Sequence, residues 1–249
     1  MTSTSSQKQS LFPSLQAVVD RLINDFEKIA PERKAVLKQL SRFVEKCIVE
    51  HRVSKLNFIC THNSRRSHLS QLWGQAAAHY YNIPDVQCFS GGTEATAFNP
   101  RAVKAMQDVG FEISKIKEGE NPLYQVFFAK GRNPVMAFSK KYDDPFNGTN
   151  DFAAIMTCSH ADENCPLVKG ATARILLTYD DPKEFDNTAA EGIKYKERVE
   201  QIGTEILYAF HVPRTKLSQS KNPSPDHFGK KMSKKFHIFS GGICIFRII

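Results

Sequence analysis

Apolar positions near the start of the chain recur at helical spacing. They do so first over residues 15–26 and again over 35–48, after a proline at position 31. This pattern predicts a hairpin of two helices between Leu15 and His51. The segment contains no grouping of residues that indicates chemistry.

Beyond residue 54 the pattern changes to short apolar runs separated by helical stretches. Runs at 55–60, 86–90, 153–157 and 175–179 predict buried strands, and stretches at 69–81, 99–109 and 193–210 predict helices. Strands that alternate with helices are typical of an α/β fold with a doubly wound, mainly parallel sheet, here of four strands. Ligands bind such sheets at the carboxyl ends of the strands, which is where Cys60 lies.

The segment 115–150 fits this alternation poorly and predicts an inserted hairpin beside the site, with apolar runs at 124–129 and 135–138. After residue 210 the periodicity is lost. We therefore expect an N-terminal helical extension over 1–53, a catalytic domain over 54–212 and a basic, disordered tail over 213–249.

Charge and composition limit the class of protein. The chain has 249 residues and a net charge of +8, but the part from Val212 onward holds eight basic residues and one acid, so the body is almost neutral. This distribution argues against a nucleic-acid partner. No apolar run is long enough to span a membrane, no secretory signal is evident, and six cysteines are too sparse for a disulfide framework. We expect a cytoplasmic enzyme.

The polar loop after the first predicted strand is the strongest chemical signal. It reads Cys60-Thr61-His62-Asn63-Ser64-Arg65-Arg66-Ser67, with the form C-x5-R-S. A loop that closes onto a helix N-terminus directs backbone N–H groups at an anion and favours the thiolate of Cys60. Arg66 offers a bidentate donor to an oxyanion, Ser67 a hydrogen bond to sulfur, and Asn63 tolerates a left-handed backbone.

Other interpretations of this loop stay open. Cys60 could end its strand as a small buried apolar residue, since C-x5-R is short and arises by chance. His62 and His68 are more typical of a loop and a helix start than of metal ligands, so we expect no metal and no cofactor. Arg65 is expected to be solvated or to add attraction for anions.

The loop resembles that of the low-molecular-weight protein tyrosine phosphatase superfamily, which includes the thioredoxin-coupled arsenate reductases and has the pattern C-x-x-N-x-x-R-S. Two further runs, 90–94 (SGGTE) and 99–106 (NPRAVKAM), are similar to the second strand and second helix of those reductases. The resemblance extends from Leu56 to Phe210, interrupted by the insert at 115–150. It implies a cysteine-nucleophile enzyme that binds a tetrahedral oxyanion.

Two more cysteines distinguish the two branches of the superfamily. Cys158 and Cys165 lie seven residues apart after a predicted strand, the spacing of the second and third redox cysteines in the arsenate reductases. Reduction of As(V) to As(III) needs two electrons, which two thiols supply by forming a disulfide. The pair could also be unrelated loop cysteines, or with His160 half of a zinc site, although the usual zinc-ligand spacing is missing.

The superfamily's general acid is an aspartate before a proline, and Asp181 in Asp180-Asp181-Pro182 matches it. A simple β-turn would also explain this sequence, and Asp144 in Asp143-Asp144-Pro145 is a rival candidate. The glutamate that helps some arsenate reductases to bind potassium is replaced here by Gln71, so we predict no such ion.

The leading hypothesis from the resemblance is an arsenate reductase that is regenerated by thioredoxin. The alternative is a tyrosine phosphatase that hydrolyses phosphotyrosine or small phosphomonoesters through a cysteinyl-phosphate on Cys60. A third interpretation is an oxyanion-binding adaptor whose helical hairpin is the interaction surface.

Overall fold

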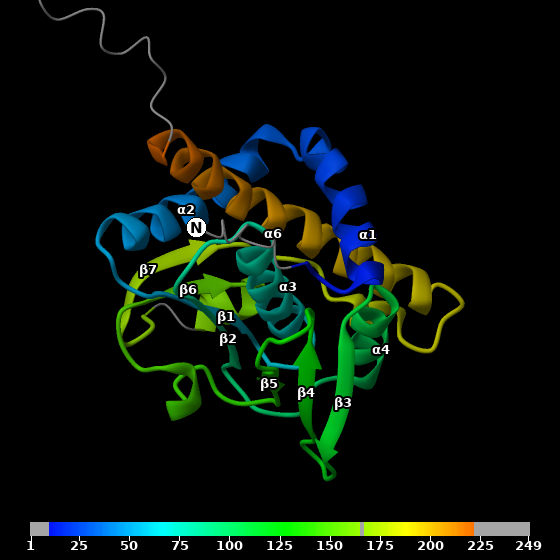
Figure 1. Ribbon diagram of the computed structural model, residues 1–249. Coiled ribbons are helices and arrows are strands. Elements are labelled where there is room, and N and C mark those ends of the chain that lie inside the picture. Colours follow the sequence, from blue (N-terminus) through cyan, green and yellow to red (C-terminus); the bar gives the residue numbers. More distant parts are fainter. Residues whose placement is uncertain (1–9, 165–166, 222–249) are drawn as a thin grey trace, which may run out of the picture. The chain divides into compact units, whose positions relative to one another are not determined.

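The computed structural model describes residues 10–164 and 167–221. Its centre is a four-stranded parallel sheet in the order β2-β1-β6-β7 (Figure 1). The strands are β1 (Ser54–Cys60), β2 (Val86–Gly92), β6 (Phe152–Met156) and β7 (Ala171–Leu176). Both faces of the sheet are covered, because Leu56 and Phe58 of β1 join the main core while Ile59 joins a second, smaller cluster. The predicted doubly wound α/β fold is confirmed.

The helices that surround the sheet begin where the sequence provides start signals. Prolines occupy the first turns of three helices, and the Asn99 side chain accepts a hydrogen bond from the backbone N–H of Arg101. The α-helices are α1 (Pro13–Leu22), α2 (Pro31–Val49), α3 (Arg66–Tyr80), α4 (Pro100–Asp108), α5 (Ser159–Asn164) and α6 (Glu191–Lys221). Short 3-10 helices are η1 (Ile23–Lys28), η2 (Pro145–Asn147) and η3 (Pro182–Phe185).

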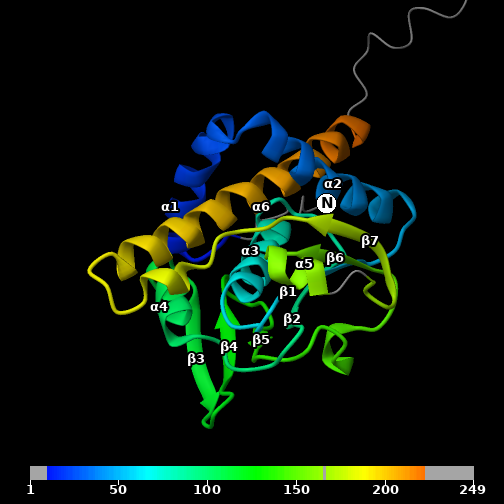
Figure 2. The same cartoon turned by 180° about the vertical axis from the view of Figure 1, so that it is seen from behind.

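The predicted N-terminal helical hairpin is α1 and α2, with η1 between them. Both helices lie beside α6 in the two opposite views (Figures 1 and 2). Leu15, Leu22 and Leu37 are fully buried in the main core, and the Ser41 hydroxyl donates to the carbonyl of Ala209 at 2.8 Å. The extension therefore shares its core with the sheet.

The predicted insert forms a second sheet. Strands β3 (Glu112–Lys117), β4 (Leu123–Phe127) and β5 (Val135–Ala137) pair antiparallel in that order. The expected hairpin is β4 and β5, and β3 adds a third strand that starts before residue 115. The segment after β5 reaches the sheet, since Gly92 N–H donates to the Lys140 carbonyl at 2.9 Å.

The end of α6 differs from the expectation. The apolar pattern predicts an end at Phe210, but the helix continues through Pro213 to Lys221. Pro213 has no N–H to donate to the carbonyl of Ala209, and the Ser41 hydroxyl of α2 donates to that carbonyl at 2.8 Å. The described residues up to Thr215 form one compact unit, and most of the predicted tail lies outside the described residues. Within residues 10–164 and 167–221, none of the helices has the length and apolar character that a bilayer span requires.

Candidate active site

The loop between β1 and α3 holds Cys60 against Ser67. Cys60 Sγ lies 3.1 Å from Ser67 Oγ, and Asn63 Nδ2 donates to that same hydroxyl oxygen at 2.8 Å. A thiolate can only accept, so in that state Ser67 donates its proton to the sulfur. Asn63 has a left-handed backbone (φ 44°), and its Oδ1 accepts from the backbone N–H of Lys140 at 2.8 Å. One amide thus joins the loop, the α3 start and the inserted segment.

The carbonyl groups of the loop point outward. Four of them accept hydrogen bonds from neighbouring segments. The Cys60 carbonyl accepts from Thr93 N–H, and that of Thr61 from Glu94 N–H and the Thr93 hydroxyl. The His62 carbonyl accepts from the hydroxyls of Thr96 and Ser139, and that of Ser64 from Asn99 N–H. A tight loop whose carbonyls point outward turns its N–H groups inward, and the first turn of α3 has unpaired N–H groups of its own. The loop has the electrostatics of an anion cradle.

Arg66 connects this cradle to the predicted acid. Its Nη1 donates to the Tyr179 carbonyl at 2.9 Å and its Nη2 to Asp181 Oδ2 at 2.8 Å. Its Nε is buried and has no hydrogen-bond partner among the described residues, which leaves a donor for an oxyanion. The rival Asp144 caps η2 through Phe146 N–H instead.

Arg65 corrects an expectation. The sequence suggested a solvated or anion-attracting side chain, but Arg65 is buried and its Nε donates to the Tyr195 hydroxyl at 2.8 Å. Its Nη2 donates to Asp186 Oδ2 at 3.3 Å. Neither partner stands out in the sequence, because Tyr195 belongs to α6 and Asp186 follows η3, far along the chain.

Cys158 lies beside the loop and contacts Thr61, the residue that follows Cys60. It follows β6, which pairs directly with β1, and it is buried in the same small cluster as Cys60. Its Sγ is 3.4 Å from Thr61 Oγ1, which also lies 3.2 Å from His160 Nδ1. Cys165 lies outside the described residues.

His62 and His68 lie in different surroundings. His62 is exposed, with Nε2 3.6 Å from the Glu94 carboxylate, while His68 is buried and stacks on Phe98. Burial lowers the pKa of His68 well below its usual value, so its ring is neutral. In the part of the chain that the structure describes, no group of three or more metal-ligating side chains comes together.

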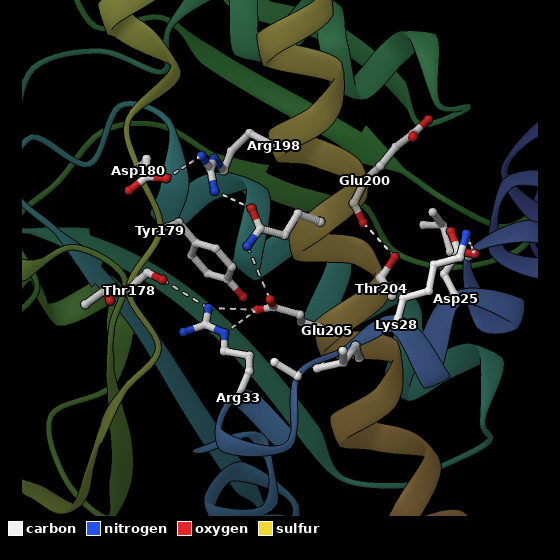
Figure 3. Close-up of a pocket in the computed structure, with 14 residues that line it drawn as sticks. Asp25, Lys28, Arg33, Thr178, Tyr179, Asp180, Arg198, Glu200, Thr204 and Glu205 are labelled. Atoms are coloured by element: carbon white, nitrogen blue, oxygen red, sulfur yellow. Dashed lines mark hydrogen bonds and ion pairs between the residues drawn. The ribbon is translucent and has the colours of Figure 1, made fainter. Parts of the chain in front are cut away.

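The segment that leads to Asp181 is held by contacts with α2 of the N-terminal extension. A cavity of about 570 Å³ lies between η1, α2 and α6, and Figure 3 shows its lining. Arg33 of α2 donates to the Thr178 carbonyl at 3.0 Å and pairs with Glu205 at 2.7 Å. Its guanidinium also covers the Tyr179 ring, 4.8 Å from the centroid. The N-terminal extension thus supports the segment between β7 and the candidate acid.

The sheet order, the C-x5-R-S loop and the Arg66–Asp181 pair agree with the low-molecular-weight phosphatase-like fold that the sequence led us to expect. No family model matches the chain. Curated relatives do: the arsenate reductases of Shouchella clausii and of Brevibacillus brevis are each 31% identical over 150 residues, 60% of this chain and 89% and 88% of those proteins. The arsenate reductase of Bacillus subtilis is 28% identical over 150 residues, 60% of this chain and 89% of that protein. The chain belongs to the arsenate reductase family.

Solved structures are more distant. A YwlE mutant from Bacillus subtilis aligns with a TM-score of 0.45 and 14% identity over 66% of this chain and 99% of that chain. A thioredoxin-dependent arsenate reductase from Corynebacterium glutamicum aligns with a TM-score of 0.38 and 16% identity over 82% of this chain and 98% of that chain. Likenesses at this level carry no argument about function.

Proposed function

We propose that this protein reduces arsenate through a relayed disulfide. The Cys60 thiolate attacks arsenic in arsenate held by the loop N–H groups and Arg66. Asp181 gives a proton to the departing oxygen, which leaves as water, and a Cys60 sulfur–arsenic bond forms. The contacts of Cys60 with Ser67 and of Arg66 with Asp181 support these steps.

The redox step uses the second cysteine. The Cys158 thiolate attacks Cys60 sulfur, and the electron pair of the sulfur–arsenic bond goes to arsenic, so that As(III) leaves as arsenite. The two thiols have then lost two electrons as a Cys60–Cys158 disulfide. Cys165 attacks Cys158 and moves the disulfide to Cys158–Cys165, and a dithiol protein, thioredoxin, reduces it. A reducing cytoplasm suits this cycle.

The observation that carries this proposal is the 3.4 Å contact between Cys158 Sγ and Thr61 Oγ1. It sets a buried thiol, just after a strand that pairs with β1, against the residue next to Cys60. The relatives named arsenate reductase support the same substrate. Ester hydrolysis needs no second thiol in this position.

A phosphatase activity is the second candidate. Cys60, Arg66 and Asp181 suffice to form and hydrolyse a cysteinyl-phosphate, since phosphate and arsenate share shape and charge. The buried, unpartnered Arg66 Nε would serve either oxyanion equally well. The two activities can therefore occur in one protein.

The test distinguishes the disulfide relay, which only arsenate reduction needs, from the oxyanion loop, which both reactions need. Cys158→Ser should abolish reduction of arsenate with thioredoxin, thioredoxin reductase and NADPH, yet leave hydrolysis of p-nitrophenyl phosphate within about threefold of the parent. Cys165→Ser should reduce one equivalent of arsenate and then stop. Cys47→Ala, which changes a buried thiol on α2, is the matched control and should keep both activities. Equal loss of both activities in Cys158→Ser, or full cycling of Cys165→Ser, would overturn the relay.

A further inference from the structure

Three side chains from three separate segments form a closed hydrogen-bonded triangle beside the oxyanion loop. Arg65 Nε donates to the Tyr195 hydroxyl at 2.8 Å, and that hydroxyl donates to Asp186 Oδ1 at 2.8 Å. Arg65 Nη2 closes the triangle on Asp186 Oδ2 at 3.3 Å. The Arg65 side chain is 10% exposed and that of Asp186 17%, so the triangle is largely shielded from water. Burial raises the pKa of Tyr195 to about 12, which keeps its hydroxyl proton in place.

This triangle fixes one end of the segment that carries the candidate acid. Asp181 and Asp186 flank η3, and the turn is held internally by Lys183, whose N–H donates to Asp181 Oδ1 and whose carbonyl accepts from Asp186 N–H. At its other end the segment is held by Arg66 through Asp181 Oδ2 at 2.8 Å. Arg65 Nε lies 3.9 Å from Asp181 Oδ1. Two consecutive arginines of the loop therefore bind the two ends of one short turn.

The two arginines have different electrostatic roles. Arg66 keeps an unpartnered Nε that can bind an oxyanion. The Arg65 charge lies against the Asp186 carboxylate, which Arg101 also approaches at 3.8 Å, and the Arg65 Nε and Nη2 donate within the triangle. An arginine satisfied in this way adds little attraction for an anion, but its planar fork fixes the relative position of the groups that it bridges.

We propose that Arg65 is a positioning residue that, with Tyr195 and Asp186, holds the Asp181 carboxyl where it can protonate the departing oxygen. The proposal rests on the proposed function, because it gives Asp181 the role of general acid. When the free Arg66 Nε binds an oxyanion, the charge of Arg66 is shared between that ligand and the Asp181 carboxylate. The triangle then keeps the turn in place, so that proton transfer does not depend on Arg66 alone.

The experiment measures single-turnover reduction of arsenate by the full chain over a range of arsenate concentrations. Arg65→Met and Tyr195→Phe should each lower the maximal rate constant about 10- to 100-fold, while the half-saturating arsenate concentration changes less than about threefold. The double variant should be no slower than the slower single variant, because both substitutions disrupt the same hydrogen-bonded triangle. Arg65→Lys should resemble Arg65→Met, since an ammonium cannot bridge two acceptors as a fork does.

Lys196→Met is the matched control. Lys196 follows Tyr195 on α6, its side chain is 69% exposed and it pairs only loosely with Glu200, so this variant should react at the rate of the parent. Tyr195→Phe keeps the ring in place and serves where Arg65→Met does not fold, as judged by thermal unfolding. A half-saturating concentration raised tenfold or more at an unchanged maximal rate would mean that Arg65 binds the anion, and it would overturn the proposal.

Hydrolysis of aryl phosphates provides the second arm of the experiment, where the parent hydrolyses these esters. Loss of a positioned acid should slow phenyl phosphate, which has a poor leaving group, about tenfold more than 2,4-dinitrophenyl phosphate, which has a good one. Equal losses on both esters would refute the positioning role while leaving the cysteine chemistry intact. A parent that neither reduces arsenate nor hydrolyses either ester would instead overturn the proposed function itself, and the positioning role with it.

Discussion

The glycine at the end of β2 sets how closely the oxyanion loop can approach the sheet, and Gly92→Ala tests this. Gly92 pairs with Cys60 in the parallel ladder. A Cβ added there would lie 2.3 Å from the Glu94 carbonyl oxygen and 2.6 Å from both Asn63 N and the Thr61 carbonyl oxygen. All three are backbone atoms, so no side chain can turn away to relieve the clash.

The size of the effect follows from these distances. They fall short of an ordinary contact of 3.4 Å by about 0.8 to 1.1 Å, so the loop must move by that order. A displacement of about 1 Å in a catalytic array costs on the order of 100-fold in rate, and overpacking of a rigid site costs about 1–3 kcal/mol of stability. We expect Gly92→Ala to lose about 100-fold in kcat/KM for arsenate and for p-nitrophenyl phosphate alike, because both use the same cradle.

The measurements are steady-state kinetics and urea unfolding of Gly92→Ala beside Gly192→Ala. Gly192 lies in the first turn of α6, where an added Cβ has open space, so that variant should keep its activity and be equally or slightly more stable. If Gly92→Ala stays within threefold of the parent in both reactions, the loop is not fixed by this contact and the reasoning is wrong.

Two further predictions concern buried charges. Arg33→Ala strands the buried carboxylate of Glu205 and should lower the free energy of unfolding by about 2–3 kcal/mol in urea denaturation, whereas a loss below about 0.5 kcal/mol would contradict the pairing. Burial lowers the pKa of Lys140 from 10.5 to about 8, and Asp144 offsets this only in part. Between pH 8 and 10.5 the unfolded chain binds a proton at this lysine that the folded chain does not, so Lys140 by itself should raise stability with pH by about 3 kcal/mol. Burial raises the pKa values of Cys88, Tyr179 and Tyr195, and these groups oppose the rise. In urea titrations at pH 8, 9 and 10, Lys140→Met should lack this contribution, so its stability should fall relative to that of the parent as pH rises; parallel profiles would refute it.

Each of these two changes has a matched control. Lys34→Ala removes the cation next to Arg33 in the sequence. Lys34 pairs with the exposed Glu27, so this variant should change stability by less than about 0.5 kcal/mol. Lys141→Met removes an exposed lysine next to Lys140 and should leave the pH dependence of stability between pH 8 and 10.5 as it is in the parent.

The sequence by itself determined the alternation of strands and helices and the position of the oxyanion loop, although β7 spans Ala171–Leu176 and not the predicted 175–179. The features concerned are contiguous: an apolar run that fits a strand, then a polar loop of eight residues, then a helix start. In such a segment backbone preferences and local hydrogen bonds decide the geometry. Asn63 illustrates this, since a residue type that tolerates the left-handed region has φ 44°.

The choice between the two Asp-Pro candidates could not come from local sequence. Asp144 and Asp181 have the same signature, and each caps a short 3-10 helix. Only the packing of the segment 178–181, which follows β7, against Arg66 brings Asp181 to the loop.

The tertiary structure alone decided which distant side chains meet at the site. Cys158 reaches Thr61 because β6 pairs with β1, and Arg65 is buried because α6 brings Tyr195 against it. Contacts of this kind depend on how the burial of a whole core arranges its elements, and that free energy is summed over many residues. No short pattern encodes such a sum, so the loop could be recognised in the sequence while its surroundings could not.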